Sequence, residues 1–158
     1  MTGRPGDLQP QEVISKIGSH LLLVEDNQDD VDLTVLALND ASIANELVVA
    51  RDGEEALDLI FGTETHEGHK LNLPQLILLD INLPKMSGIE VLKRLREDER
   101  ARAVAVVMLT SSREEQDIID SYHSGANSYL QKPIDYDEFV QAIRNAGVYW
   151  LLLNRTPW

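Results

Sequence analysis

Leu76-Ile77-Leu78-Leu79-Asp80 is the stretch of sequence that decides the fold, because four consecutive apolar residues stop abruptly at a carboxylate. A short, uninterrupted apolar run is typical of a strand buried on both faces, as in a parallel sheet. Three more strand-like runs end at polar residues: 21–24 at Glu25 and Asp26, 104–109 at Thr110, and 128–131 at Lys132. Ligands bind outside the carboxyl ends of the strands in an open α/β sheet, so we expect these side chains to meet at one edge.

Helix-like segments alternate with these runs from residue 20 onward, and residues 46–50 supply a further short strand. We predict helices over about 27–39, 52–61, 88–98 and 114–123, and a last helix from about 135 that continues into residues 149–153. Strands that alternate with helices require right-handed crossovers. The sequence therefore predicts an α/β fold with five (βα) units, in which a doubly wound parallel sheet carries helices on both faces.

Composition excludes several classes of function. The chain has 158 residues, enough for one domain with a full core, and it has no cysteine, which rules out disulfides, zinc thiolates and thiol catalysis. Its net charge of −13 argues against nucleic-acid binding. The polar N-terminus does not resemble a secretory signal, and no apolar run approaches the roughly 20 residues that span a membrane. We therefore expect a cytoplasmic protein.

The two ends of the chain differ in character. Residues 1–18 contain Gly3, Pro5, Gly6 and Pro10 and predict a flexible tail, residues 19–147 form the predicted domain, and 148–158 extend its last helix. The extension is apolar on all sides through Tyr149, Trp150, Leu151, Leu152 and Leu153. A solvated surface helix would not have that pattern, so we expect a homodimer through the last helix and this extension. The alternative is that the extension folds back on its own domain.

The three carboxylates at the strand ends indicate a metal site. Glu25, Asp26 and Asp80 would repel one another by about 4 kcal/mol per pair at 4 Å in an effective dielectric near 20, and a divalent cation relieves that repulsion. An all-oxygen set that leaves room for water favours Mg²⁺ over zinc. We expect Asp26 and Asp80 to coordinate directly, Glu25 directly or through water, and the backbone carbonyl of Asn82 as a further ligand.

Asp80 is the predicted nucleophile, because an aspartate can attack phosphorus and form an acyl phosphate. The transferred phosphoryl group spreads negative charge over its oxygens, and the metal and Lys132 can absorb that charge. Thr110 can donate a hydrogen bond to it, and Ser111 is small enough to leave the site open.

The order of these motifs resembles the response-regulator receiver family across about residues 20–145. The matching segments are Leu23-Val24-Glu25-Asp26-Asn27, Asp80 to Gly88, Met108-Leu109-Thr110-Ser111, Gly125-Ala126-Asn127 and Lys132-Pro133. The resemblance implies the flavodoxin-like strand order 2-1-3-4-5. The long polar loop after Phe61, Thr110-Ser111-Ser112 and the tail 148–151 further resemble the single-domain response regulators of bacterial and cyanobacterial phytochromes.

By this resemblance, Asp80 is the phosphoacceptor, and Glu25 and Asp26 are the acidic metal pair. Thr110 is the switch hydroxyl, Lys132 pairs with the phosphoryl group, and Tyr129 is the aromatic that turns inward when Thr110 moves. The Lys132-Pro133 bond is expected to be cis. The implied protein is a stand-alone phosphoacceptor rather than an enzyme. It would take its phosphoryl group from a histidine kinase, a phytochrome in the closer resemblance, and signal by protein contact.

Two other functions remain open at this point. A pseudo-receiver would have the same fold and bind partners without accepting phosphate. A phosphatase of the haloacid dehalogenase type also uses an aspartyl nucleophile, but members of that family carry the motif Asp-x-Asp-x-Thr on their first strand. Here Asp80-Ile81-Asn82 lies on the third predicted strand, with Asn82 where the second acid should be. Glu25 stands where the receiver family more often has aspartate, which bears on how directly it binds the metal.

Overall fold

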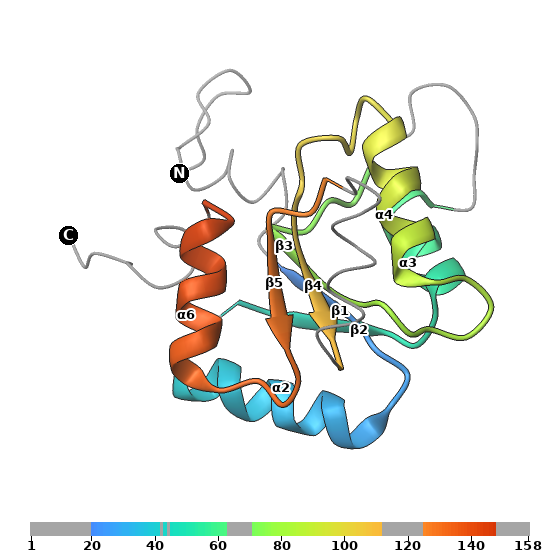
Figure 1. Ribbon diagram of the computed structural model, residues 1–158. Coiled ribbons are helices and arrows are strands. Elements are labelled where there is room, and N and C mark those ends of the chain that lie inside the picture. The colour runs from blue at the N-terminus through green and yellow to red at the C-terminus, as the bar shows by residue number, and fades with distance from the viewer. Residues whose placement is uncertain (1–19, 42, 44, 63–70, 112–124, 148–158) are drawn as a thin grey trace, which may run out of the picture.

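Five parallel strands form a single sheet in the order β2-β1-β3-β4-β5 (Figure 1), which confirms the predicted topology. The structure is a computed structural model, and it describes residues 20–41, 43, 45–62, 71–111 and 125–147. The strands are β1 (Leu21–Val24), β2 (Leu47–Ala50), β3 (Leu76–Asp80), β4 (Ala105–Thr110) and β5 (Ser128–Gln131). All residues of β1, β3 and β4 are buried, as their uninterrupted apolar runs predict.

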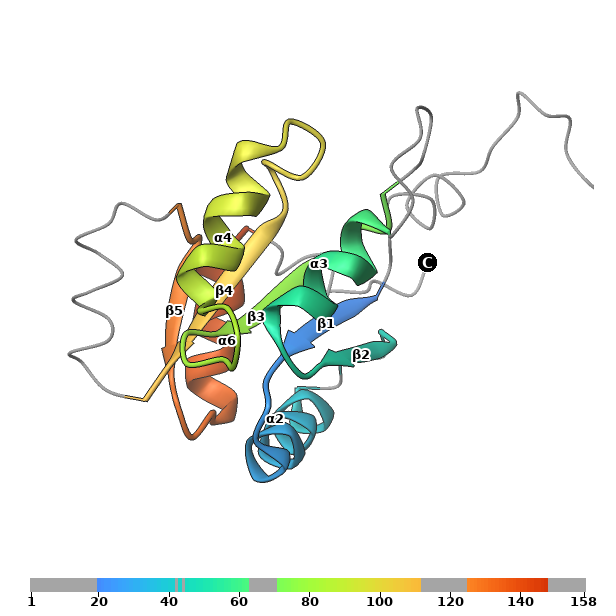
Figure 2. The ribbon, with the colours of Figure 1, turned by 90° about the vertical axis from the view of Figure 1, so that its right-hand side faces the viewer.

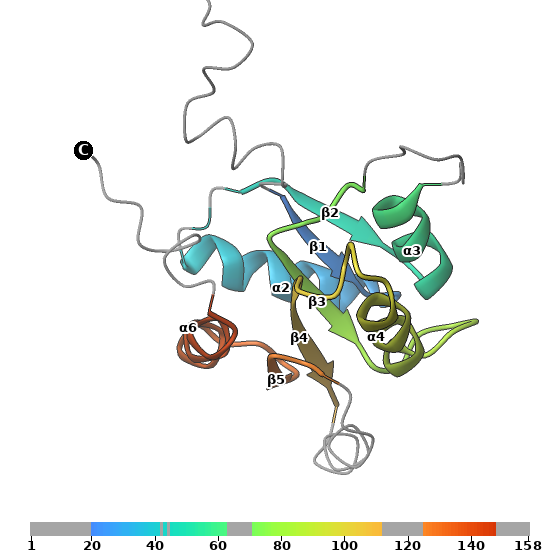
Figure 3. The ribbon, with the colours of Figure 1, turned by 90° about the horizontal axis from the view of Figure 1, so that it is seen from above.

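The sheet separates two hydrophobic layers, and alternate residues of each strand enter opposite ones. Leu78 and Val107 join a cluster with α2 (Gln28–Asp40) and α6 (Tyr136–Asn145). Ile77, Leu79 and Met108 join the second cluster, with α3 (Gly53–Phe61) and α4 (Gly88–Glu97). Figures 2 and 3 show these two pairs of helices on opposite faces of the sheet. The central strands are thereby fixed from both sides.

Each of these four helices begins after a residue whose side chain accepts a hydrogen bond from the backbone N–H three residues on. The capping residues are Asn27, Asp52, Ser87 and Asp135. These caps satisfy backbone donors that the helix leaves unpaired, and they set the helix starts within two residues of the predicted ones. No helix in the described part of the chain is long and apolar enough to cross a membrane.

Some predictions fall outside the described residues. They are the tail at 1–18, the helix at 114–123, and the extension at 148–158 with its proposed contacts Tyr149, Trp150, Leu152 and Leu153. The domain boundaries at 18 and 147 therefore stay predictions from the sequence.

The strand register determines which polar residues become neighbours. Val24 pairs with Leu79, so Glu25 and Asp80 follow side by side on adjacent strands. Thr110 pairs with Gln131, and the backbone N–H of Lys132 donates to the carbonyl oxygen of Thr110 at 2.8 Å. The ends of β1, β3, β4 and β5 thus meet at one edge, as the sequence predicts.

Among the described residues, Phe139 is the largest fully buried side chain, and it anchors α6 against the sheet. Phe139→Ala should lower the free energy of unfolding by about 3–5 kcal/mol, because the substitution removes buried apolar surface and leaves a cavity. Urea titration followed by circular dichroism would measure the loss. Tyr136→Ala is the matched control, since Tyr136 lies on the same helix but is 46% exposed; a loss comparable to that of Phe139→Ala would contradict the assignment of Phe139 to the core.

Candidate functional site

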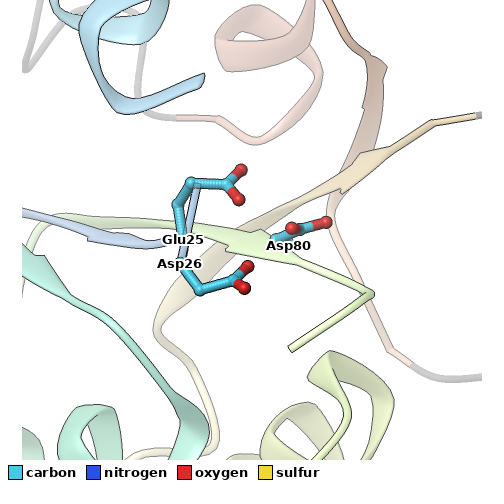
Figure 4. Close-up of side chains that lie close together, drawn as sticks. All are labelled: Glu25, Asp26 and Asp80. Atoms are coloured by element: carbon cyan, nitrogen blue, oxygen red, sulfur yellow. The ribbon is translucent and has the colours of Figure 1, made fainter. Parts of the chain in front are cut away.

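Three carboxyl groups converge at the carboxyl edge of the sheet. Glu25 and Asp26 follow β1 and Asp80 ends β3, and Figure 4 shows the first two side chains extending toward Asp80. One oxygen from each carboxylate lies within 4.8 Å of the others. Glu25 and Asp80 are 1% and 2% exposed, whereas Asp26 is exposed. Two of the acids are therefore held out of water, and the third faces the solvent.

Backbone groups next to the strand ends orient the two buried carboxylates. The N–H of Asn27 donates to Oε2 of Glu25 and the N–H of Asn82 donates to Oδ1 of Asp80, each at 3.3 Å. Gly88 is also required, since a Cβ atom there would overlap the backbone carbonyl oxygen of Asp80. The missing side chain at Gly88 lets α4 begin directly against the strand end that carries Asp80.

The ammonium group of Lys132 contacts three carboxylates at once. Its Nζ lies 2.8 Å from Oδ2 of Asp30, 3.1 Å from Oε1 of Glu25 and 3.3 Å from Oδ2 of Asp80. Burial by itself would lower the pKa of Lys132, but the hydrogen bond to Asp30 and the charges of Asp80 and Glu25 raise it overall. The side chain of Lys132 is 13% exposed, and its ammonium group therefore stays protonated at neutral pH.

Negative charge exceeds positive charge in this cluster. Desolvation, the hydrogen bond with Asp80 and the charge of Asp80 raise the pKa of Glu25 to about 7, although Lys132 opposes the rise. The physical cause is that the carboxylate of Glu25 is buried and lies beside the carboxylate of Asp80. Additional positive charge at this edge would stabilise both ionised groups.

The donor chemistry of the site fits a hard divalent cation. Glu25, Asp26 and Asp80 offer only oxygen ligands, and exposed Asp26 leaves one side accessible to water. Mg²⁺ prefers this combination of one or two carboxylates with water and phosphate oxygens. Zinc sites use histidine and cysteine more often, and this chain has no cysteine.

The structure places Thr110 and Ser111 at the same edge and Tyr129 within β5, and the three residues differ in exposure. Thr110 is buried at the end of β4, and Ser111 is exposed beside it. Tyr129 is half-buried, pairs with Met108 in the sheet and packs against the α3–α4 cluster. The Lys132-Pro133 peptide bond is cis, in agreement with what the resemblance implies.

Asp30 is the site residue that the sequence analysis missed. It lies in the first turn of α2 next to Asp29, and both acids suit the positive end of that helix. The spacing of Asp30 and Thr34 could have indicated that Asp30 faces the interior. Residues four apart lie on one helix face, and Thr34 is buried. An acid on the buried face of a helix needs a partner, and here the partner is Lys132.

Comparisons with known proteins agree on one family. A family model described as the response regulator receiver domain matches residues 21–144. The chain is 38% identical over 137 residues to "Probable methanogenesis regulatory protein FilR2" of Methanothrix harundinacea, covering 87% of this chain and 86% of that protein. It is 36% identical over 131 residues to "Response regulator Rcp1" of Synechocystis sp., covering 83% and 88%.

Solved structures agree with the fold. The bacteriophytochrome response regulator AtBRR superposes with a TM-score of 0.75 at 45% sequence identity, covering 87% of this chain and 99% of that one. The family model spans residues 21–144, which include the strand ends that carry the acids, Thr110 and Lys132.

The raised pKa of Glu25 predicts a pH-dependent stability in EDTA. The fold holds this proton more tightly than the unfolded chain does, so the stabilisation is complete below pH 4.5 and is lost as the pH rises through about 7. At about 1.4 kcal/mol per pKa unit, the full loss over the rise from 4.5 to about 7 is roughly 3–4 kcal/mol. Denaturant titrations at pH 5 and 8 should show a smaller loss for Glu25→Gln, which cannot ionise. Equal losses in both proteins would contradict the prediction.

Proposed function

We propose that this chain, which belongs to the response regulator receiver family, accepts a phosphoryl group on Asp80 from a histidine kinase and signals by protein contact. The observation that carries the proposal is the environment of Asp80. Its carboxylate is buried at the carboxyl edge, 3.3 Å from the Lys132 ammonium and grouped with Glu25 and Asp26. A nucleophilic carboxylate beside a fixed cation and an acidic pair is suited to phosphoryl transfer.

The transfer is a substitution at phosphorus. An Oδ oxygen of Asp80 attacks the phosphorus of a phosphohistidine, a P–O bond forms and the P–N bond breaks. The leaving imidazole nitrogen keeps the bonding electron pair and takes a proton from water. Lys132 stabilises the negative charge that develops on the phosphoryl oxygens, and the hydroxyl of Thr110 donates a hydrogen bond to one of them.

Mg²⁺ is the proposed cofactor. Glu25, Asp26 and Asp80 would hold it with the backbone carbonyl of Asn82, and when bound it neutralises charge on the carboxylates and the phosphoryl group. The crystal structure of the Mn²⁺-bound form of response regulator Rcp1 is similar to this chain, at 32% identity and a TM-score of 0.64. The Mn²⁺ bound by that relative supports a divalent cation here, and the oxygen-only ligand set favours magnesium.

Phosphorylation would act as a switch through β4 and β5. An aspartyl phosphate adds about −1.5 to −2 charge by analogy with other phosphorylated residues, and this charge attracts Thr110 and Lys132. Movement of Thr110 would let Tyr129 turn inward and shift the population of two surface conformations. A similar structure, at 33% identity and a TM-score of 0.63, is that of the phosphorylated cyanobacterial phytochrome response regulator RcpA.

A phytochrome is the proposed kinase. The support is the similarity to response regulators of bacterial phytochromes, at 42% and 45% identity. The proposed role is that of a phosphoacceptor that catalyses only its own phosphorylation and dephosphorylation. The cytoplasmic location stays a prediction from the sequence.

Acetyl phosphate tests the proposed chemistry directly. With Mg²⁺, intact mass spectrometry should show one phosphoryl adduct on the wild type and none on Asp80→Asn, because the nucleophile is lost. EDTA should abolish the wild-type adduct. If rapid quenching of folded wild-type protein shows no adduct, the chain is a pseudo-receiver that binds partners without accepting phosphate.

The proposed homodimer is tested by shortening the chain. A chain that ends after Gly147 lacks the apolar residues 149–153 and should be monomeric by light scattering, because the contact surface is removed. A chain that ends after Asn154 keeps those residues and serves as the control, which should remain dimeric. A dimer that survives removal of residues 148–158 would exclude the extension as the interface.

A further inference from the structure

Asp30 makes the shortest contact to Lys132, at 2.8 Å, although it lies outside the set of three carboxylates that converge for a metal. Its side chain is 26% exposed and that of Lys132 is 13% exposed, so the ion pair is partly screened from water. The contact joins the first turn of α2 to the residue that follows β5, which are 102 positions apart in the sequence. The proposed phosphoryl transfer gives Asp30 no role.

The backbone around Asp30 is firmly held. The side chain of Asn27 accepts a hydrogen bond from the N–H of Asp30 at 3.1 Å, and the hydroxyl of Thr34 donates to the carbonyl oxygen of Asp30 at 2.8 Å. Val31, the next residue, is buried in the core. Asp30 therefore presents its carboxylate to Lys132 from a fixed position.

The ammonium group has three N–H donors, and three carboxylates receive them. A phosphoryl group on Asp80 needs at least one of these donors, so a contact must be given up. Phosphorylation converts the Asp80 carboxylate into a neutral acyl group, and a bound cation shares the charge of Glu25. Asp30 is then the carboxylate that keeps its full charge and competes with the phosphoryl oxygens.

We propose that Asp30 is a positioning residue that holds the Lys132 ammonium in the unphosphorylated protein and competes with the phosphoryl group of Asp80 for it. This inference rests on the proposed function. It implies that the ion pair between α2 and Lys132 weakens when Asp80 is phosphorylated. It also implies that Asp30 draws the ammonium away from Glu25 and Asp80, where its charge would oppose binding of a cation.

The two consequences have opposite signs in one variant. Asp30→Asn removes the charge that competes for Lys132. Beryllofluoride, an analogue of the phosphoryl group, should then half-saturate the protein at about threefold lower concentration when Mg²⁺ is saturating. A change of this size is expected for a partly exposed ion pair. Mg²⁺ alone should bind about threefold more weakly, because Lys132 then shifts toward Glu25 and Asp80. Calorimetric titration at fixed ionic strength measures both affinities.

Asp29→Asn is the matched control, because it removes one charge from the same helix turn at an exposed residue. It should leave beryllofluoride binding near the wild-type value. Asp30→Glu keeps the charge and should restore the wild-type pattern, and thermal unfolding verifies that each variant is folded.

The outcomes separate the inference from the proposed function. Wild-type protein that binds no beryllofluoride and accepts no phosphoryl group would refute the proposed function and this inference with it. A second outcome is that the wild type binds beryllofluoride while Asp30→Asn binds it with the same affinity as Asp29→Asn, or more weakly. That result would refute the role of Asp30 alone. Weaker binding of both ligands would mark Asp30 as merely structural.

Discussion

The pairing of one ammonium with several carboxylates at the carboxyl edge is the interaction on which the site depends. Lys132 lies within 3.3 Å of Asp30, Glu25 and Asp80, and two of these acids are almost fully buried. Removing such charges from water is costly unless they are paired. The pairing is incomplete, because the acids outnumber the ammonium. Burial of Glu25 and the neighbouring charge of Asp80 raise the pKa of Glu25, and the excess of negative charge makes the edge receptive to a cation.

The two hydrophobic layers hold the backbone at this charged edge in place. Leu79 and Leu109 are buried immediately before the polar ends of β3 and β4, and the pairing of these two strands holds both ends in register. A closely packed interior resists small displacements, so Asp80 and Thr110 have little freedom at the backbone. The positions of the backbone groups are therefore fixed by packing. The side chain of Lys132 carries the adjustable charge.

Strand ends could be predicted from the sequence because the apolar runs of the central strands are uninterrupted and each stops at a polar residue. Glu25, Asp80 and Thr110 follow from that pattern together with the parallel sheet. Asp30 could not be found in the same way, because Asp29 and Asp30 both fit the start of a helix and only the tertiary contact distinguishes them. The packing of Tyr129 was also not predictable. Its position in β5 follows from the sequence, but its half-buried state depends on tertiary contacts with the hydrophobic cluster of α3 and α4.

A phosphoryl group would enter a site that already holds excess negative charge, so the response must come from the available cations. A bound metal is constrained by its carboxylate ligands, whereas Lys132 can exchange partners because its three donors point to three different elements. Any gain of phosphoryl contact by Lys132 is a loss for Asp30, Glu25 or Asp80. The loss at Asp30 reaches α2, and the movement of Lys132 reaches β5. The same exchange of partners would thus transmit the phosphorylation state to two surface elements, in addition to the path through Thr110 and Tyr129.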